Sequence, residues 1–119
     1  LYCGNNKITQ LLNIPSFITE LDCSNNQIRQ LDNLPRKVKY IDCSNNCIAQ
    51  LNNLPDSLEI IYCYANLIEQ MQNLPLGLKV LYCYNNKLNL DKNTHNNLFQ
   101  NLPASLKFIN YNNKIEILE

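Results

Sequence analysis

The sequence predicts a right-handed, curved solenoid of the α/β class, with a parallel β-sheet of about six short strands on its concave face and little helix. Three observations predict it: columns of like residues recur at 20-residue steps, each step contains a short alternation of apolar and polar residues, and the step is too short for a full helix. The seven columns are represented in the second unit by Leu21, Cys23, Asn26, Ile28, Leu31, Leu34 and Pro35.

The strand of each unit is the stretch of alternation, for example Ile41, Asp42, Cys43 and Ser44. Such a stretch predicts a strand of about three or four residues. One unit cannot bury its apolar side alone, but units stacked in register bury it against one another, in a parallel sheet with strands about 4.8 Å apart. The Asn column that follows is expected to satisfy backbone groups at the turn with its buried amide.

The return segment of each unit ends in Leu-x-Asn-Leu-Pro, at residues 31–35 in the second unit. Pro fixes its own φ and keeps the preceding residue out of the helical region. The return is therefore expected to be extended, polyproline-like or 3₁₀.

Two departures from the step are visible. About eight extra residues at 89–96 are expected to bulge from the side opposite or flanking the strands. In the last unit Asn113 and Ile115 arrive one residue early, so the final strand has either lost a residue or slipped in register. Residues 1–119 are predicted to form a single array of about six units. Because neither end has a polar cap, we expect a fragment of a longer array, or ends that other chains cover.

One clean unit reads VKYIDCSNNCIAQLNNLP, residues 38–55. It resembles the leucine-rich repeat, L-x-x-L-x-L-x-x-N-x-L, whose defining positions are taken here by Val38, Ile41, Cys43, Asn46 and Ile48. The short step and the Leu-Pro ending are similar to the short subclass of secreted bacterial effectors, although that subclass usually has a second Pro per unit. Similar Asn- and Cys-rich versions occur in intracellular bacteria and amoebal giant viruses. The resemblance implies a protein-binding module, with any catalytic activity in a separate domain.

Composition argues against two kinds of partner. Ten basic residues balance ten acidic ones, so a generic electrostatic grip on nucleic acid or on an anionic membrane is not expected. No apolar run approaches the roughly 18 residues of a membrane span. We therefore expect a protein partner and neither nucleic acid nor membrane.

Six Cys residues raise the question of disulfides or metal. Five of them fill one inward column, where a free Cys acts as a small hydrophobe, and disulfides between parallel neighbours would strain the sheet. Such thiols predict folding in a reducing, intracellular compartment, which includes a host cytoplasm. The alternative is zinc. Cys43 and Cys47 are four residues apart, but they are expected to point to different sides and no second pair or nearby His completes a site. We expect no metal and no cofactor.

The outward positions of the strands collect aromatic residues that a solvated face would not. Tyr offers a large contact area at low entropic cost, so it is favoured at interface centres. The alternative is Tyr stacking that only stabilises the sheet. The candidate partner-binding residues are Tyr40, Tyr62, Tyr64, Tyr82, Tyr84, Phe108, Asp22 and Asp42.

Asp22 and Asp42 are expected on adjacent strands at the acidic end of this face. Two close carboxylates are compatible with glycosidase chemistry, with a partner's Lys or Arg, with a cation, or with a plain solvated edge. No pocket-forming insertion lies near them, so catalysis is not expected. His95 lies in the polar insertion, and a lone loop His without a placed nucleophile is no catalytic signature. The insertion either adds a contact or is a tolerated surface loop.

The sequence therefore predicts a non-enzymatic protein–protein interaction module that binds its partner through a Tyr-rich concave face. The alternative is a structural or assembly protein whose uncapped ends stack on neighbouring chains and cause self-association. A sheet face does not name its partner.

Overall fold

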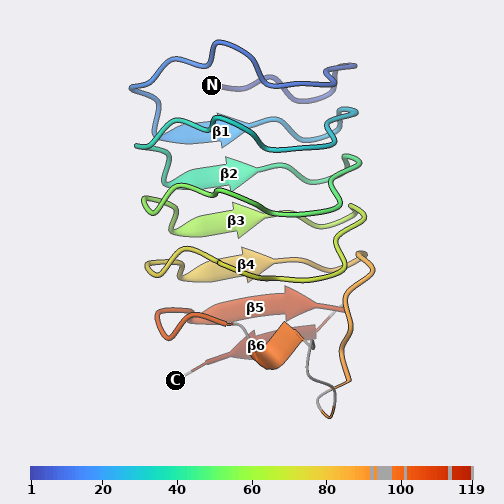
Figure 1. Ribbon diagram of the computed structural model, residues 1–119. Coiled ribbons are helices and arrows are strands. Elements are labelled where there is room, and N and C mark those ends of the chain that lie inside the picture. The colour runs from blue at the N-terminus through green and yellow to red at the C-terminus, as the bar shows by residue number, and fades with distance from the viewer. Residues whose placement is uncertain (92, 94–97, 101, 113, 119) are drawn as a thin grey trace.

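The computed structural model describes residues 1–91, 93, 98–100, 102–112 and 114–118. The elements are β1 (Glu20–Asp22), β2 (Tyr40–Asp42), β3 (Ile60–Tyr62), β4 (Val80–Tyr82), η1 (Leu98–Gln100), β5 (Phe108–Tyr111) and β6 (Lys114–Ile117). The six strands form one sheet and lie in it in sequence order, like the rungs of a ladder (Figure 1). The short 3₁₀ helix η1 is the only helical element of the described residues, among which no helix has the length and hydropathy of a membrane span.

Strands β1 to β5 pair in parallel, in the register that the 20-residue step predicts. The apolar residues that lie opposite one another are Leu21, Ile41, Ile61, Leu81 and Ile109. The last of these comes eight residues later than the step, so the extra residues are left out of the sheet. Before β1, Tyr2 forms a single parallel bridge with Asp22. The predicted solenoid with a parallel sheet is confirmed.

The last unit is a β-hairpin. Strand β6 runs antiparallel to β5, with Tyr111 opposite Lys114, and Asn112 at the turn has a φ of 46°. Asn in a left-handed conformation is typical of the tight two-residue turns that join antiparallel strands. The early arrival of Asn113 and Ile115 thus marks a chain reversal. Neither a lost residue nor a slipped parallel register explains it, although Asn113 itself lies outside the described residues.

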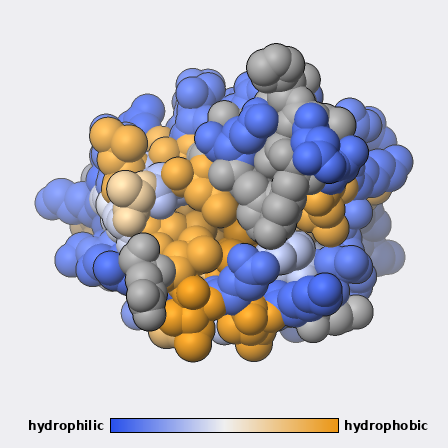
Figure 2. All heavy atoms as spheres, turned by 90° about the horizontal axis from the view of Figure 1, so that it is seen from below, coloured by the Kyte–Doolittle hydropathy of each residue, from blue (hydrophilic) through white to orange (hydrophobic). Residues whose placement is uncertain are grey.

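The hairpin leaves apolar side chains on the C-terminal end of the molecule. Ile115 and Ile117 on β6 are 63% and 72% exposed. Seen from this end, apolar residues gather into one patch (Figure 2). Because β6 is also the last strand of the sheet, this end combines an exposed strand edge with exposed apolar groups.

The core is made by the inward columns of the sheet and of the return segments. Cys23, Cys43, Cys63 and Cys83 are fully buried in it, whereas Cys47 is exposed; all are free thiols. Burial raises the pKa of Cys23 and of Cys83 to about 12. The prediction of a buried, un-ionised thiol column is confirmed for these four residues.

The Asn column behind the strands forms a hydrogen-bonded ladder, as predicted. The Oδ1 of Asn46 accepts the backbone N–H of Ile28 at 2.9 Å. Its Nδ2 donates to the carbonyl oxygens of Cys23, in the preceding unit, and of Cys43 and Ser44, in its own, at 3.0 to 3.2 Å. Asn26 and Asn66 repeat this pattern. Each amide therefore ties one unit to the next inside the core.

Two further Asn columns have a different role, which the sequence did not show. Their backbones are left-handed, with φ between 53° and 60°, a conformation that Asn tolerates better than other non-Gly residues. The first column follows the strands, and Ala65 takes one of its places with a φ of 54°. The second precedes the Leu-Pro pair. The Asn members of the two columns are Asn5, Asn25, Asn45 and Asn85, and Asn13, Asn33, Asn53 and Asn73.

Candidate functional site

The concave sheet face is formed by three rows of residues that alternate with the buried columns. The first row runs Glu20, Tyr40, Ile60, Val80 and Phe108. The second runs Asp22, Asp42, Tyr62, Tyr82 and Asn110. The third, just past the strands, runs Gly4, Ser24, Ser44, Tyr64 and Tyr84. The parallel register therefore brings together all eight residues that the sequence singled out.

Five Tyr rings on this face contact one another. Tyr62 and Tyr82 have ring centroids 4.5 Å apart and tilted planes, and Tyr64 and Tyr84 are stacked at 4.6 Å with planes 4° apart. We call these four residues the Tyr block. Tyr40 extends it with an edge contact to Tyr62 at 5.6 Å. The rings are neither buried nor fully exposed, so each packs on its neighbours and also presents surface to solvent. Stacking within the sheet and an accessible aromatic surface thus coexist.

The environment of Tyr40, Tyr62 and Tyr84 favours their protonated phenols. Burial, and then the nearby Asp42 carboxylate, raise the pKa of Tyr40 to about 12. Burial also raises the pKa of Tyr62 and Tyr84, with contributions from the neighbouring rings Tyr82 and Tyr64. At neutral pH these hydroxyl groups are therefore hydrogen-bond donors as well as acceptors.

The acidic end of the face lies on β1 and β2. The Oδ1 of Asp22 accepts hydrogen bonds from the N–H and hydroxyl of Ser24, at 3.0 and 2.7 Å. Among the described residues, the only donor to the Oδ1 of Asp42 is the N–H of Ser44, at 3.0 Å. Glu20 accepts a hydrogen bond from the Tyr2 hydroxyl at 3.1 Å. The Asp-x-Ser spacing in the sequence indicates the two Asp–Ser hydrogen bonds, because an Asp carboxylate often accepts the backbone N–H of the residue two positions later.

The Ser44 hydroxyl distinguishes the two aspartates. Its oxygen is buried and has no hydrogen-bond partner, whereas the Ser24 hydroxyl donates to its own aspartate. The Asp42 carboxylate is consequently held by one internal donor fewer than that of Asp22. Asp22 and Asp42 face each other in register on adjacent strands. Within the described part of the chain, no group of three or more His, Cys, Asp or Glu side chains is arranged to hold a metal ion.

Phe108 lies at the other end of the face. It is opposite Val80 in register and 42% exposed. With Ile60 it makes the first row apolar over β3, β4 and β5. The face therefore changes along the solenoid axis from acidic, through aromatic, to apolar.

The insertion is closed at its base. The N–H of Leu98 donates to the carbonyl of Asn89 at 3.0 Å, so the chain leaves and rejoins the repeat at neighbouring points. His95 lies outside the described residues, and its predicted surface position stays a prediction.

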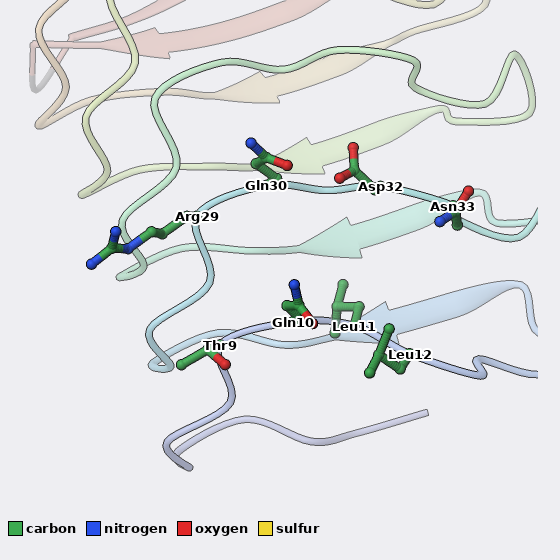
Figure 3. Close-up of a pocket in the computed structure, with 8 residues that line it drawn as sticks. All are labelled: Thr9, Gln10, Leu11, Leu12, Arg29, Gln30, Asp32 and Asn33. Atoms are coloured by element: carbon green, nitrogen blue, oxygen red, sulfur yellow. The ribbon is translucent and has the colours of Figure 1, made fainter.

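A cavity on the opposite side of the molecule was not anticipated. It has a volume of about 410 Å³ and lies between the return segments of the first two units (Figure 3). Similar hollows follow between the next segments. Among the residues 9–14, 29–34, 49–54 and 69–74, no backbone hydrogen bond joins neighbouring segments. The cavities are therefore gaps between return segments, lined mostly by polar side chains such as Gln10 and Gln30.

No protein-family model matches the chain, and no curated protein sequence does. Solved structures do match it. YopM from Yersinia enterocolitica WA-314 superposes with a TM-score of 0.75 and 28% identity, over 93% of this chain and 28% of that one. A Shigella effector LRR domain superposes with a TM-score of 0.60 and 16% identity, over 92% of this chain and 61% of that one. The chain thus spans about a quarter of the first structure and a little less than two thirds of the second. The expected leucine-rich-repeat fold is supported over nearly the whole chain.

Proposed function

We propose that this chain is a protein–protein interaction module and that its concave sheet face binds the partner. The observation that carries the proposal is the Tyr block, four half-exposed rings in one tilted and one stacked pair at the centre of the face. Protein interfaces favour Tyr because it supplies a rigid, large contact area with a polar tip. Repeat arrays use their extended concave surfaces in this way. Asp22 and Asp42 at one end and Phe108 at the other complete the proposed contact surface.

The test compares three baits in affinity capture from cell extract, followed by measurement with the purified partner. The first is the wild-type chain, and the second changes Tyr62, Tyr64, Tyr82 and Tyr84 to Ala. The third is a matched control on the opposite side, in which the exposed Gln10, Gln30, Gln50 and Gln70 become Ala at the same 20-residue spacing. The partner should bind wild type and the Gln control alike and bind the Tyr variant at least tenfold more weakly. Equal binding to all three folded baits would contradict the proposed face.

The proposed setting is a reducing compartment, such as a host cytoplasm. Six free thiols, four of them buried without disulfides, support it. One structural neighbour is described as an effector domain, and an effector-like role for this chain is part of the proposal. Reversible binding without catalysis is the activity that follows.

A second candidate is assembly through the ends, because the edge strand β6 exposes Ile115 and Ile117. Such an edge is a template for pairing with another chain. Light scattering on the purified chain separates the candidates. Assembly would be favoured if the mass of the wild type rises with concentration while a variant with Ile115→Lys and Ile117→Lys keeps the mass of a monomer. A monomer at every concentration would dismiss it.

A further inference from the structure

The concave sheet face is polarised in charge although the chain as a whole is neutral. Glu20, Asp22 and Asp42 lie at one end, and none of the described residues in its three rows is Lys or Arg. Lys79, which directly precedes β4, forms an ion pair with Glu59 at 2.9 Å. A partner that covers the face must therefore bring its own positive charge to the acidic end.

Asp42 lies where the acidic and aromatic parts meet. It is opposite Tyr62 in register, and Tyr40 is two residues before it on the same strand. Those two rings are in edge contact at 5.6 Å. Its carboxylate accepts one hydrogen bond, from the N–H of Ser44 to Oδ1, and the described residues donate none to Oδ2. An acceptor with spare capacity thus lies beside a pair of aromatic rings.

This combination fits one side chain best. A guanidinium group is planar, forms paired hydrogen bonds with a carboxylate and lies flat on aromatic rings. It is attracted to the face of Tyr as well as to the negative charge. A Lys ammonium is a compact, strongly hydrated charge, which neither stacks flat on an aromatic ring nor forms paired hydrogen bonds with a carboxylate.

Building on the proposed function, we infer that the partner contributes an extended segment with an Arg that Asp42 binds over Tyr40 and Tyr62. The neighbouring apolar or aromatic residues of that segment pack on the Tyr block. The distance from β1 to β4 is about 14 Å, which about four or five extended residues span. Acidic or phosphorylated segments are excluded by the three carboxylates.

The experiment selects peptides from a displayed random library on the wild-type chain. Selected sequences that compete with one another should be enriched in Arg. One of them is then synthesised and combined in a double-mutant cycle, with Asp42→Asn in the protein and Arg→Gln in the peptide. Each single change should lower the affinity about tenfold, and the two together should cost little more, because they remove the same contact. Asn keeps an oxygen for the Ser44 N–H, so the turn is preserved.

Asp32→Asn, an exposed carboxylate on the opposite side, is the charge-matched control and should change nothing. Peptides that depend on the Tyr block without Arg, and that bind Asp42→Asn as well as wild type, would overturn the inference and leave the proposed function standing. A selection that yields no peptide dependent on the Tyr block would overturn both. An Arg→Lys peptide that binds equally well would show a simple charge preference and overturn the assignment to Arg.

Discussion

On the sheet side of the solenoid each unit is hydrogen-bonded to the next, whereas on the return side neighbouring units only pack. The backbone N–H of Cys23 donates to the backbone carbonyl of Asp42 at 2.8 Å, and that of Asn25 donates to the backbone carbonyl of Ser44 at 2.9 Å. The side-chain amides of the Asn column add further hydrogen bonds between units behind the strands. The return segments contribute buried Leu residues but leave gaps of several hundred Å³. Cohesion between the units is therefore concentrated behind the face proposed for binding.

This arrangement suits a binding surface. Residues held by a continuous hydrogen-bonded sheet keep their relative positions, so the Tyr block is presented with little left to order on binding. The return side has no comparable constraint and can vary in its polar residues.

Asn46→Ala removes the amide that joins its own unit to the preceding one on the sheet side. It leaves the N–H of Ile28 without its partner inside the core and removes the three hydrogen bonds that the amide donates, while the Cys23 carbonyl keeps the Asn26 amide as a donor. An orphaned buried polar group costs about 1–3 kcal/mol and each lost hydrogen bond about 1 kcal/mol, so a loss of about 3 kcal/mol or more in unfolding free energy is expected. Urea denaturation measures it. Asn53→Ala is the control on the return side and should cost about 1 kcal/mol, the penalty of a left-handed Ala. Equal losses of unfolding free energy in the two variants would contradict the difference in cohesion between the sheet side and the return side.

The thiol column should make the sheet side sensitive to alkali. The pKa of Cys23 and of Cys83 is about 12 in the folded chain and near 9 when unfolded. The unfolded state therefore loses its protons first, and stability that is complete below about pH 9 falls as the pH rises toward 12. Urea denaturation at several pH values between 7 and 11 measures this fall in unfolding free energy, and the fall should be smaller in Cys83→Ala. At neutral pH, a thiol reagent should modify the exposed Cys47 long before these two. Rapid labelling of Cys23 in the native state would contradict a closed core.

Much of this fold could be predicted because the chain repeats. Columns such as those of Cys43 and Asn46 fix the strand, its direction and its register several times over, and the grouping of the Tyr block followed from that register. The hairpin at β5 and β6 occurs once, and in the sequence the stretch after Tyr111 resembles an imperfect copy of the repeat. Because the hairpin occurs only once, no repeated column of residues predicts it.

Features that depend on side-chain geometry could not be predicted from the sequence for another reason. The spacing that brings Asp22 and Asp42 together says nothing of which Ser hydroxyl turns toward its carboxylate. Likewise, the Asn-rich composition conceals two physical roles. Asn46 uses its amide in the core, and Asn53 uses its tolerance of a positive φ. Residue identity is the same in both columns, and only the backbone separates them.

Ala65→Asn should stabilise the sheet side. Ala65 has a φ of 54°, in a column where the other members are Asn, and Asn tolerates this conformation better than Ala. A gain of about 0.5–1 kcal/mol in unfolding free energy is expected. Thermal and urea unfolding measure it, with Ala65→Gly as a second variant that should also gain. Because Tyr64 is the adjacent residue, partner binding should be measured on the same variants and should be unchanged. A loss of stability in both variants would show that Ala65 is not strained.

Gln50→Ala on the return side should have the smallest effect. The side chain is exposed, and the hydrogen bond to its Oε1 comes from the Asn52 amide two residues away, within the same segment. Ala keeps the extended backbone, and no bond between units is broken, so the unfolding free energy should change by no more than about 0.5 kcal/mol. The measurement is urea denaturation beside Asn46→Ala in the same unit. A loss above about 1 kcal/mol would mean that the polar groups lining the gaps hold the units together, and cohesion would then have to be assigned to both sides of the solenoid.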